Sequence, residues 1–304
     1  MSAAVRACKE PQKAAALGWT GSVLENVGCM AKTTMFPRRS GGIAVHESAG
    51  GGGPLVFIHG NSSSARAFSR QLEGPLGARW RILAIDLPGH GQSEDARDPA
   101  AYLLPGQART VIAVAEGLGF ADALFVGWSR GGHILLEAAP ELGRARGFAI
   151  FGTPPLAFPP AMGQAFLPHP ALALGFQAEL TREEACAYVA AFFKAGYADI
   201  PTFFLEDALR TDGRSRAPVG AHIAPGGYRD EVKVVAELRV PLAVLHGADE
   251  QLVNGGYFAS VPMPTLWRGV VQTIAGAGHA PQWERAADFD ALIEAFARDG
   301  ETRP

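Results

Sequence analysis

Cysteine is scarce in this chain of 304 residues, which contains only three. Cys8, Cys29 and Cys186 lie far apart in the sequence and form no C-x-x-C pair. This spacing argues against both a disulfide framework and a zinc site. We therefore expect a protein of the reducing cytoplasm.

An excess of charge of one sign is also missing. The chain has 27 basic and 30 acidic residues, a formal net charge of −3, and no dense run of Lys and Arg. Nucleic acids and anionic membranes attract strongly basic surfaces, so neither is an expected partner. A small molecule is the simpler expectation, and the sequence carries no signal about oligomeric state.

The N-terminus shows no pattern of a secretory leader. Residues 1–32 are rich in Ala and Gly, but they lack a basic start followed by an unbroken apolar run. We expect this arm to be loosely ordered. Met30 and Met35 lie just before the first strand-like segment, so a genuine extension and an over-long reading frame both stay open.

Short β-rich runs alternate with helix-like stretches along most of the chain. The runs 55–58 and 124–126 are continuously apolar, as in strands buried on both faces of a covered sheet. Strands that alternate with helices predict an α/β fold with a mostly parallel, doubly wound sheet. The expected strands are Ile43–Glu47, Leu55–His59, Arg81–Asp86, Leu124–Trp128, Phe148–Phe151, Leu242–His246 and Val270–Ile274.

The alternation breaks from about residue 154 to residue 229. Repeated prolines in the first part of this stretch would interrupt a membrane-spanning helix, which needs about twenty continuous residues. These prolines are Pro155, Pro159, Pro160, Pro168 and Pro170. We expect residues 154–229 to form a largely helical cap over the carboxyl edge of the sheet, inserted into a core of residues 33–153 and 230–304.

The segment Gly127-Trp128-Ser129-Arg130-Gly131 follows a buried strand and precedes a helix-like stretch. Glycines on both sides of the serine let strand and helix approach closely, while the serine takes a strained conformation with its hydroxyl exposed. This sequence and its strand–turn–helix context match the nucleophile-elbow pattern. Ser129 is therefore the candidate nucleophile.

A serine hydroxyl needs a histidine base that is oriented by a carboxylate. His279 lies in a glycine-rich loop after the apolar strand 270–274, which would let its imidazole reach back over the sheet edge. Two adjacent carboxylates, Asp249 and Glu250, follow the preceding strand, and only one of them can orient the imidazole. The chain order serine, acid, histidine is that of the nucleophile-elbow hydrolases.

The residues around His59, Asp86, Ser129, Gly247 and His279 resemble those of the α/β-hydrolase superfamily, in its serine-nucleophile branch with an inserted cap. The resemblance runs from about residue 43 to residue 298, with the cap the least similar part. In that superfamily the acid usually follows the strand-end glycine by three positions, which here selects Glu250. The residue type used most often there is aspartate, which favours the alternative, Asp249. We favour Glu250.

The resemblance also implies an oxyanion hole built from backbone N–H groups. One donor is Arg130, directly after the nucleophile, and the other is Asn61 in the segment His59-Gly60-Asn61, which resembles the family's H-G-x motif. The Arg130 guanidinium is expected on the surface or in an ion pair. For the Asn61 side chain, a contact with substrate and a local turn bond both stay open.

Other residues of these segments have weaker functional assignments. Trp128 either touches the substrate or packs below the elbow, and Phe158 is a candidate substrate contact from an apolar cap. The segment 86–93 is expected to be structural. His46, His133 and His246 show no metal-ligand spacing, and each is expected to form a local hydrogen bond.

These residues predict a serine hydrolase that forms an acyl-enzyme and needs no metal or organic cofactor. A small to medium apolar ester is the expected substrate, as for a carboxylesterase. Carbon–carbon bond hydrolysis, lactone opening and perhydrolysis remain alternatives on the same triad. From another class of protein, a non-catalytic receptor for a small ligand could keep the same scaffold.

Overall fold

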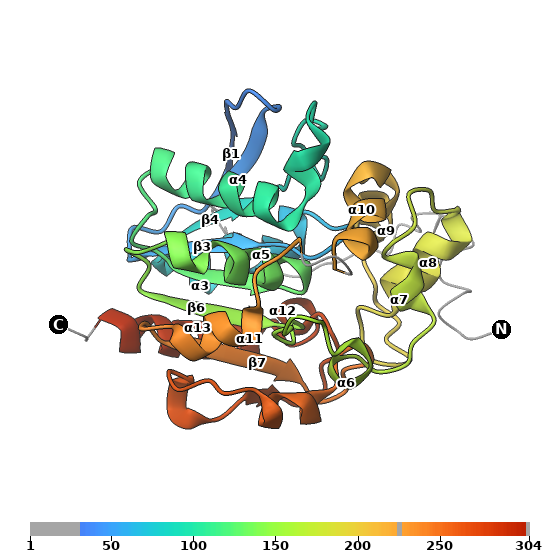
Figure 1. Ribbon diagram of the computed structural model, residues 1–304. Helices are drawn as coiled ribbons and strands as arrows, with labels where there is room; N and C mark the ends of the chain where they lie inside the picture. Colours follow the sequence, from blue (N-terminus) through green and yellow to red (C-terminus); the bar gives the residue numbers. More distant parts are fainter. Residues whose placement is uncertain (1–30, 224–226, 302–304) are drawn as a thin grey trace, which may run out of the picture.

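The computed structural model describes residues 31–223 and 227–301, which form an eight-stranded sheet covered by helices (Figure 1). The strand order is β1-β2-β4-β3-β5-β6-β7-β8. The strands are β1 Lys32–Phe36, β2 Ile43–Glu47, β3 Pro54–Ile58, β4 Arg81–Ile85, β5 Leu124–Trp128, β6 Gly147–Phe151, β7 Leu242–Gly247 and β8 Gln272–Ile274. β1 and β2 are antiparallel to their neighbours, whereas β3 to β8 run parallel. The predicted α/β fold with a mostly parallel sheet is confirmed.

Both faces of the sheet are buried because side chains along a strand alternate between them. In β3, Leu55 and Phe57 pack on one face and Val56 and Ile58 on the other. The first face is covered by η1 Ala65–Phe68, α2 Ser69–Leu72, α3 Pro75–Arg79, α12 Pro281–Glu284 and α13 Ala286–Glu301. The second is covered by α4 Leu104–Gly117, α5 Arg130–Ala138, α11 Glu231–Glu237 and η4 Gly255–Ser260. Three further 3₁₀ turns are η2 Pro99–Tyr102, η3 Ala139–Glu141 and η5 Trp267–Gly269.

A helical region lies between β6 and β7, at the end of the sheet toward which β7 points (Figure 1). Before α11 it contains α6 Met162–Ala165, α7 Ala171–Leu174, α8 Arg182–Ala190, α9 Thr202–Arg210 and α10 Gly213–Ile223. Phe192 and Phe204 from this region pack edge-on against Trp128, at ring-centroid distances of 5.5 and 6.3 Å. The region therefore shares one hydrophobic core with the first face of the sheet.

The N-terminal part differs from the expectation at one point. Lys32, which the sequence placed in the arm, begins β1, a strand that pairs with β2 and was not anticipated. Four of its five residues are exposed, so it lacks the apolar pattern by which the other strands are recognised. Residues 1–30 of the expected arm lie outside the described residues. Within the described part of the chain, no helix is both long and apolar enough to span a membrane.

Candidate active site

Ser129 sits between β5 and α5 with φ +52° and ψ −120°, a conformation that non-glycine residues rarely adopt. Its N–H donates to the Phe151 carbonyl at 2.8 Å, and the Thr153 hydroxyl donates to its carbonyl at 2.8 Å. A Cβ added to Gly131 would lie 2.2 Å from the Ile58 carbonyl oxygen, so only glycine permits this approach of helix and strand. The turn has the strained backbone that the sequence pattern predicts.

His279 lies in the loop between β8 and α12, and its partner is Glu250. Nδ1 of the imidazole is 2.8 Å from Oε2 of Glu250, and both side chains are buried. Leu252 donates its N–H to Oε1 of the same carboxylate at 2.8 Å. Asp249 is exposed and contributes no ion pair to the ring among the described residues. Of the two adjacent carboxylates, the structure brings Glu250 to the imidazole.

The charge state of Glu250 follows from these contacts. Burial alone would raise the pKa of this carboxyl group, but the attraction to His279 and the hydrogen bonds from His279 and Leu252 hold the pKa below its ordinary value. An ionised carboxylate only accepts hydrogen bonds, so Nδ1 of His279 carries the hydrogen. Nε2 is then the ring atom left for a proton from another group.

Two residues contact His279 on the side away from the pocket and hold it in place. Trp128 is buried and its indole N–H donates to the His279 carbonyl oxygen at 2.7 Å, so this side chain packs below the elbow and does not line the pocket. Gly152 has φ +60°, and a Cβ added there would lie 2.6 Å from Cε1 of the His279 ring. The imidazole therefore rests directly on the backbone that follows β6.

The two expected oxyanion donors both border the pocket that contains Ser129 and His279. Arg130 is the first residue of α5, where an N–H has no acceptor within the helix. Neither its N–H nor that of Asn61 meets an acceptor among the described residues. The Asn61 side chain donates to the Gly175 carbonyl of the helical region at 2.8 Å, and its Oδ1 accepts from the neighbouring Ser62 hydroxyl at 3.4 Å. Asn61 also lines the pocket, so a substrate contact stays open.

The expectation for the Arg130 guanidinium is wrong. The side chain is buried, and its terminal nitrogens donate to the carbonyls of Tyr102 and Ser215, each at 2.7 Å. Burial lowers its pKa to about 10. No carboxylate pairs with it in the described part of the chain. The guanidinium instead connects α5 through hydrogen bonds to Tyr102 in η2 and to Ser215 in α10.

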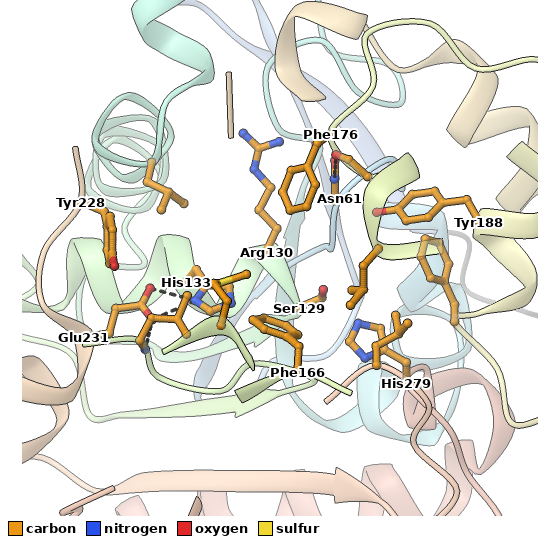
Figure 2. Close-up of a pocket in the computed structure, with 17 residues that line it drawn as sticks. Asn61, Ser129, Arg130, His133, Phe166, Phe176, Tyr188, Tyr228, Glu231 and His279 are labelled. Carbon is orange, nitrogen blue, oxygen red and sulfur yellow. Dashed lines mark hydrogen bonds and ion pairs between the residues drawn. The ribbon is translucent and has the colours of Figure 1, made fainter. Parts of the chain in front are cut away.

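The pocket above Ser129 is mainly apolar (Figure 2). Side chains from the helical region and from the loops around it form most of its wall. The apolar lining residues are Leu104, Leu156, Met162, Phe166, Leu172, Phe176, Phe192 and Leu252. Phe158, the candidate substrate contact, is not among them: it is 48% exposed and packs edge-on against Tyr228. Two prolines, Pro159 and Pro160, follow it in the sequence.

The sequence did not reveal the polar residues on the side of the pocket opposite His279. Figure 2 shows His133, Glu231 and Tyr228 on the side away from His279, with Ser129 between the two sides. His133 forms a contact with Glu231, which is distant in sequence, rather than the expected local hydrogen bond. Tyr188 also lines the pocket, and burial raises its pKa to about 12. The one available signal was that His133 follows Ser129 by four positions, one helical turn.

Two curated relatives match the chain over most of its length. It is 28% identical over 262 residues to the dihydrolipoyllysine-residue acetyltransferase component of the acetoin cleaving system of Cupriavidus necator, covering 83% of this chain and 66% of that protein. It is 26% identical over 269 residues to the AB hydrolase superfamily protein YisY of Bacillus subtilis, covering 83% of this chain and 94% of that one. The chain thus spans just under two thirds of the acetyltransferase component.

Solved structures are similar over more of the chain. The N-acyl homoserine lactonase AidH, in a complex with N-butanoyl homoserine, is 39% identical, with a TM-score of 0.86 over 90% of this chain and 98% of that one. A putative aryl esterase from Burkholderia cenocepacia, at 23% identity and a TM-score of 0.73, covers 90% of this chain and all of that one, and shares the fold. A model of the Alpha/beta hydrolase family matches residues 55–292. The chain therefore belongs to the α/β-hydrolase family.

Proposed function

We propose that this α/β hydrolase is a lactonase that opens the ring ester of N-acyl homoserine lactones through an acyl-enzyme on Ser129. The observation that carries the proposal is the arrangement of Ser129 beside the buried His279–Glu250 pair in a mainly apolar pocket. The 39% identity to an N-acyl homoserine lactonase over 90% of the chain supports the substrate class. We therefore propose a lactone substrate, which the sequence left as an alternative, in place of the linear apolar ester that the sequence alone favoured.

In the proposed mechanism, Oγ of Ser129 attacks the ring carbonyl carbon while Nε2 of His279 takes the hydroxyl proton. Glu250 stabilises the resulting imidazolium through Nδ1. The negative charge on the carbonyl oxygen is held by the N–H groups of Arg130 and Asn61. The carbonyl carbon–ring oxygen bond then breaks, His279 returns the proton to the leaving oxygen, and the acyl group remains on Ser129.

The second half of the reaction uses the same groups. Water attacks the ester on Ser129, His279 takes a proton from the water, and Ser129 leaves with that proton. The product is the ring-opened N-acyl homoserine. In a lactone the leaving hydroxyl stays tethered to the acyl group, so it competes with water by reclosing the ring. The apolar wall of the pocket favours binding of the substrate's acyl chain, which lies away from the bond that breaks.

The test is ring opening of N-hexanoyl homoserine lactone, followed by liquid chromatography and mass spectrometry. The wild type is expected to form N-hexanoyl homoserine, and Ser129→Ala is expected to lose about 10⁴-fold or more in kcat. p-Nitrophenyl hexanoate serves as the linear ester in parallel. A wild type that hydrolyses this ester but leaves the lactone intact would support an esterase and contradict the lactonase proposal.

A further inference from the structure

The pair His133–Glu231 lies across the pocket from the catalytic triad and has no part in the mechanism above. Nδ1 of His133 is 2.8 and 2.9 Å from the two carboxylate oxygens of Glu231. Oε2 of Glu231 also accepts the Leu156 N–H at 2.7 Å. The Glu231 side chain is 2% exposed, so this carboxylate is bound entirely by the protein.

These contacts determine which nitrogen of the His133 imidazole is turned toward the pocket. The carboxylate accepts from Nδ1, so Nδ1 carries a hydrogen, and in the uncharged form of the ring Nε2 presents a lone pair. His133 lines the pocket, and its Nε2 has no hydrogen-bond partner among the described residues. Figure 2 shows the ring between Glu231 and the space above Ser129. Apart from Nε2 of His279, which the mechanism uses, the described pocket residues thus include an oriented acceptor at Nε2 of His133.

The position of this acceptor relative to the nucleophile selects a substrate group. The His133 N–H donates to the Ser129 carbonyl at 3.4 Å in the first turn of α5, and both side chains line the same pocket. A donor on the carbon next to the attacked carbonyl is therefore the substrate group placed to reach Nε2 of His133.

We infer that the His133–Glu231 pair is a specificity determinant that accepts a hydrogen bond from the amide N–H of a substrate acylated on the nitrogen next to the attacked carbonyl. This inference rests on the proposed function and deepens it, because it assigns a residue to the acylamino group. Burying a polar atom in a mainly apolar wall is unfavourable unless that atom has a hydrogen-bond partner, and Nε2 of His133 has none among the described residues. A substrate without the amide leaves Nε2 unpaired and shielded from water when it fills the pocket.

The experiment compares two lactones with the same ring and the same chain length. N-hexanoyl homoserine lactone has the amide, and α-heptyl-γ-butyrolactone replaces it with methylene groups. The wild type is expected to prefer the amide lactone in kcat/KM by about tenfold or more, since an unpaired buried polar group is costly. His133→Leu is expected to remove that preference.

Glu231→Gln is the second variant, and it keeps the shape of the site. A glutamine can accept from Leu156 through its oxygen and donate to Nδ1 through its nitrogen, which moves the ring hydrogen to Nε2 and turns the acceptor into a donor. The preference for the amide lactone is expected to fall about tenfold here as well. Met162→Leu is the control, because it exchanges one apolar side chain for another in the same wall. It should change kcat/KM for both lactones by the same factor and keep the preference for the amide lactone.

The outcomes separate the two proposals. If both variants lose activity on the two lactones in equal proportion, the pair is only structural and the inference is wrong. The same holds if the wild type turns over the two lactones equally well. If the wild type opens neither lactone but hydrolyses p-nitrophenyl hexanoate, the lactonase proposal itself fails, and the assignment of His133 falls with it.

Discussion

The indole N–H of Trp128 donates to the backbone carbonyl oxygen of His279 at 2.7 Å, across 151 positions of sequence. The residue directly before the proposed nucleophile therefore holds the loop that carries the proposed base. Ring contacts reinforce this link, because the Trp128 and His279 ring centroids are 6.0 Å apart. Nucleophile and base are thus positioned by one shared side chain that does not itself enter the pocket.

Trp128→Phe keeps the ring packing and removes this hydrogen bond. The His279 carbonyl is left unpaired in a buried place, so we expect the loop to shift and kcat to fall about tenfold, with KM changed less than about twofold. Steady-state kinetics on N-hexanoyl homoserine lactone measure both constants. Trp267→Phe is the matched control, because it removes an indole hydrogen bond to Asp299 outside the pocket. Equal losses of kcat in both variants would contradict the positioning role.

Glu250→Gln and Asp249→Asn test which carboxylate orients the base. A glutamine at 250 can donate to Nδ1 of His279, which places the ring hydrogen on Nε2, where it blocks proton transfer from Ser129. We expect kcat to fall about 10²- to 10⁴-fold in Glu250→Gln and to stay within about twofold in Asp249→Asn. Initial rates at neutral pH measure this difference. The reverse pattern would show that Asp249 is the acid.

Arg130→Met tests the buried guanidinium without altering the backbone N–H proposed for the oxyanion hole. The carbonyls of Tyr102 and Ser215 lose their donors, so we expect a decrease of about 1–3 kcal/mol in the free energy of unfolding. Urea unfolding followed by fluorescence measures it. Arg144→Met, which changes an exposed arginine, should cost less than about 0.5 kcal/mol. An unchanged stability in Arg130→Met would mean that the guanidinium hydrogen bonds contribute nothing net.

Asp290→Asn tests the pH dependence of stability. Burial raises the pKa of Asp290 to about 6, against a hydrogen bond from Gln71 that lowers it. An unfolded aspartate titrates near pH 4, so between about pH 4 and pH 6 the folded state binds more protons and stability falls as pH rises. The variant is expected to be more stable than the wild type at pH 8, by about 1–2 kcal/mol, and to lose this advantage at pH 4.

Urea unfolding at the two pH values measures that difference. Asp288→Asn, at an exposed position of the same helix, is the control and should change stability by less than about 0.5 kcal/mol at both. An advantage of Asp290→Asn that is the same at pH 4 and pH 8 would contradict the assignment, because it would then not arise from titration of the carboxyl group.

Local patterns predicted the parts of the site that local geometry determines. The turn around Ser129 needs glycines wherever helix and strand touch, and this requirement is visible in five consecutive residues. His279 follows a strand in a glycine-rich loop, so its place at the sheet edge could also be inferred. The sequence limited the acid to two adjacent residues, Glu250 and Asp249, because both follow β7. Only the direction of each side chain distinguishes them.

The wall of the pocket could not be derived in this way. Residues 154–181 have no helical or strand periodicity, and their path determines that Phe166 and Phe176 face the pocket while Phe158 faces outward. The partners His133 and Glu231 are 98 positions apart, and only the packing of α11 against α5 brings them together. The guanidinium of Arg130 likewise finds its acceptors on distant elements. Side-chain direction at such positions depends on tertiary contacts that one sequence does not display.

The most direct test of the central claim is titration of the protein with a fluorophosphonate, which reacts with an activated serine. Peptide mass spectrometry locates the adduct, and ring opening of N-hexanoyl homoserine lactone is measured on the same samples. The account predicts one adduct, on Ser129, with lactone hydrolysis lost in proportion to the labelled fraction and with the lactone slowing the labelling. Full lactone hydrolysis by protein labelled completely on Ser129, or an adduct on another residue, would contradict it.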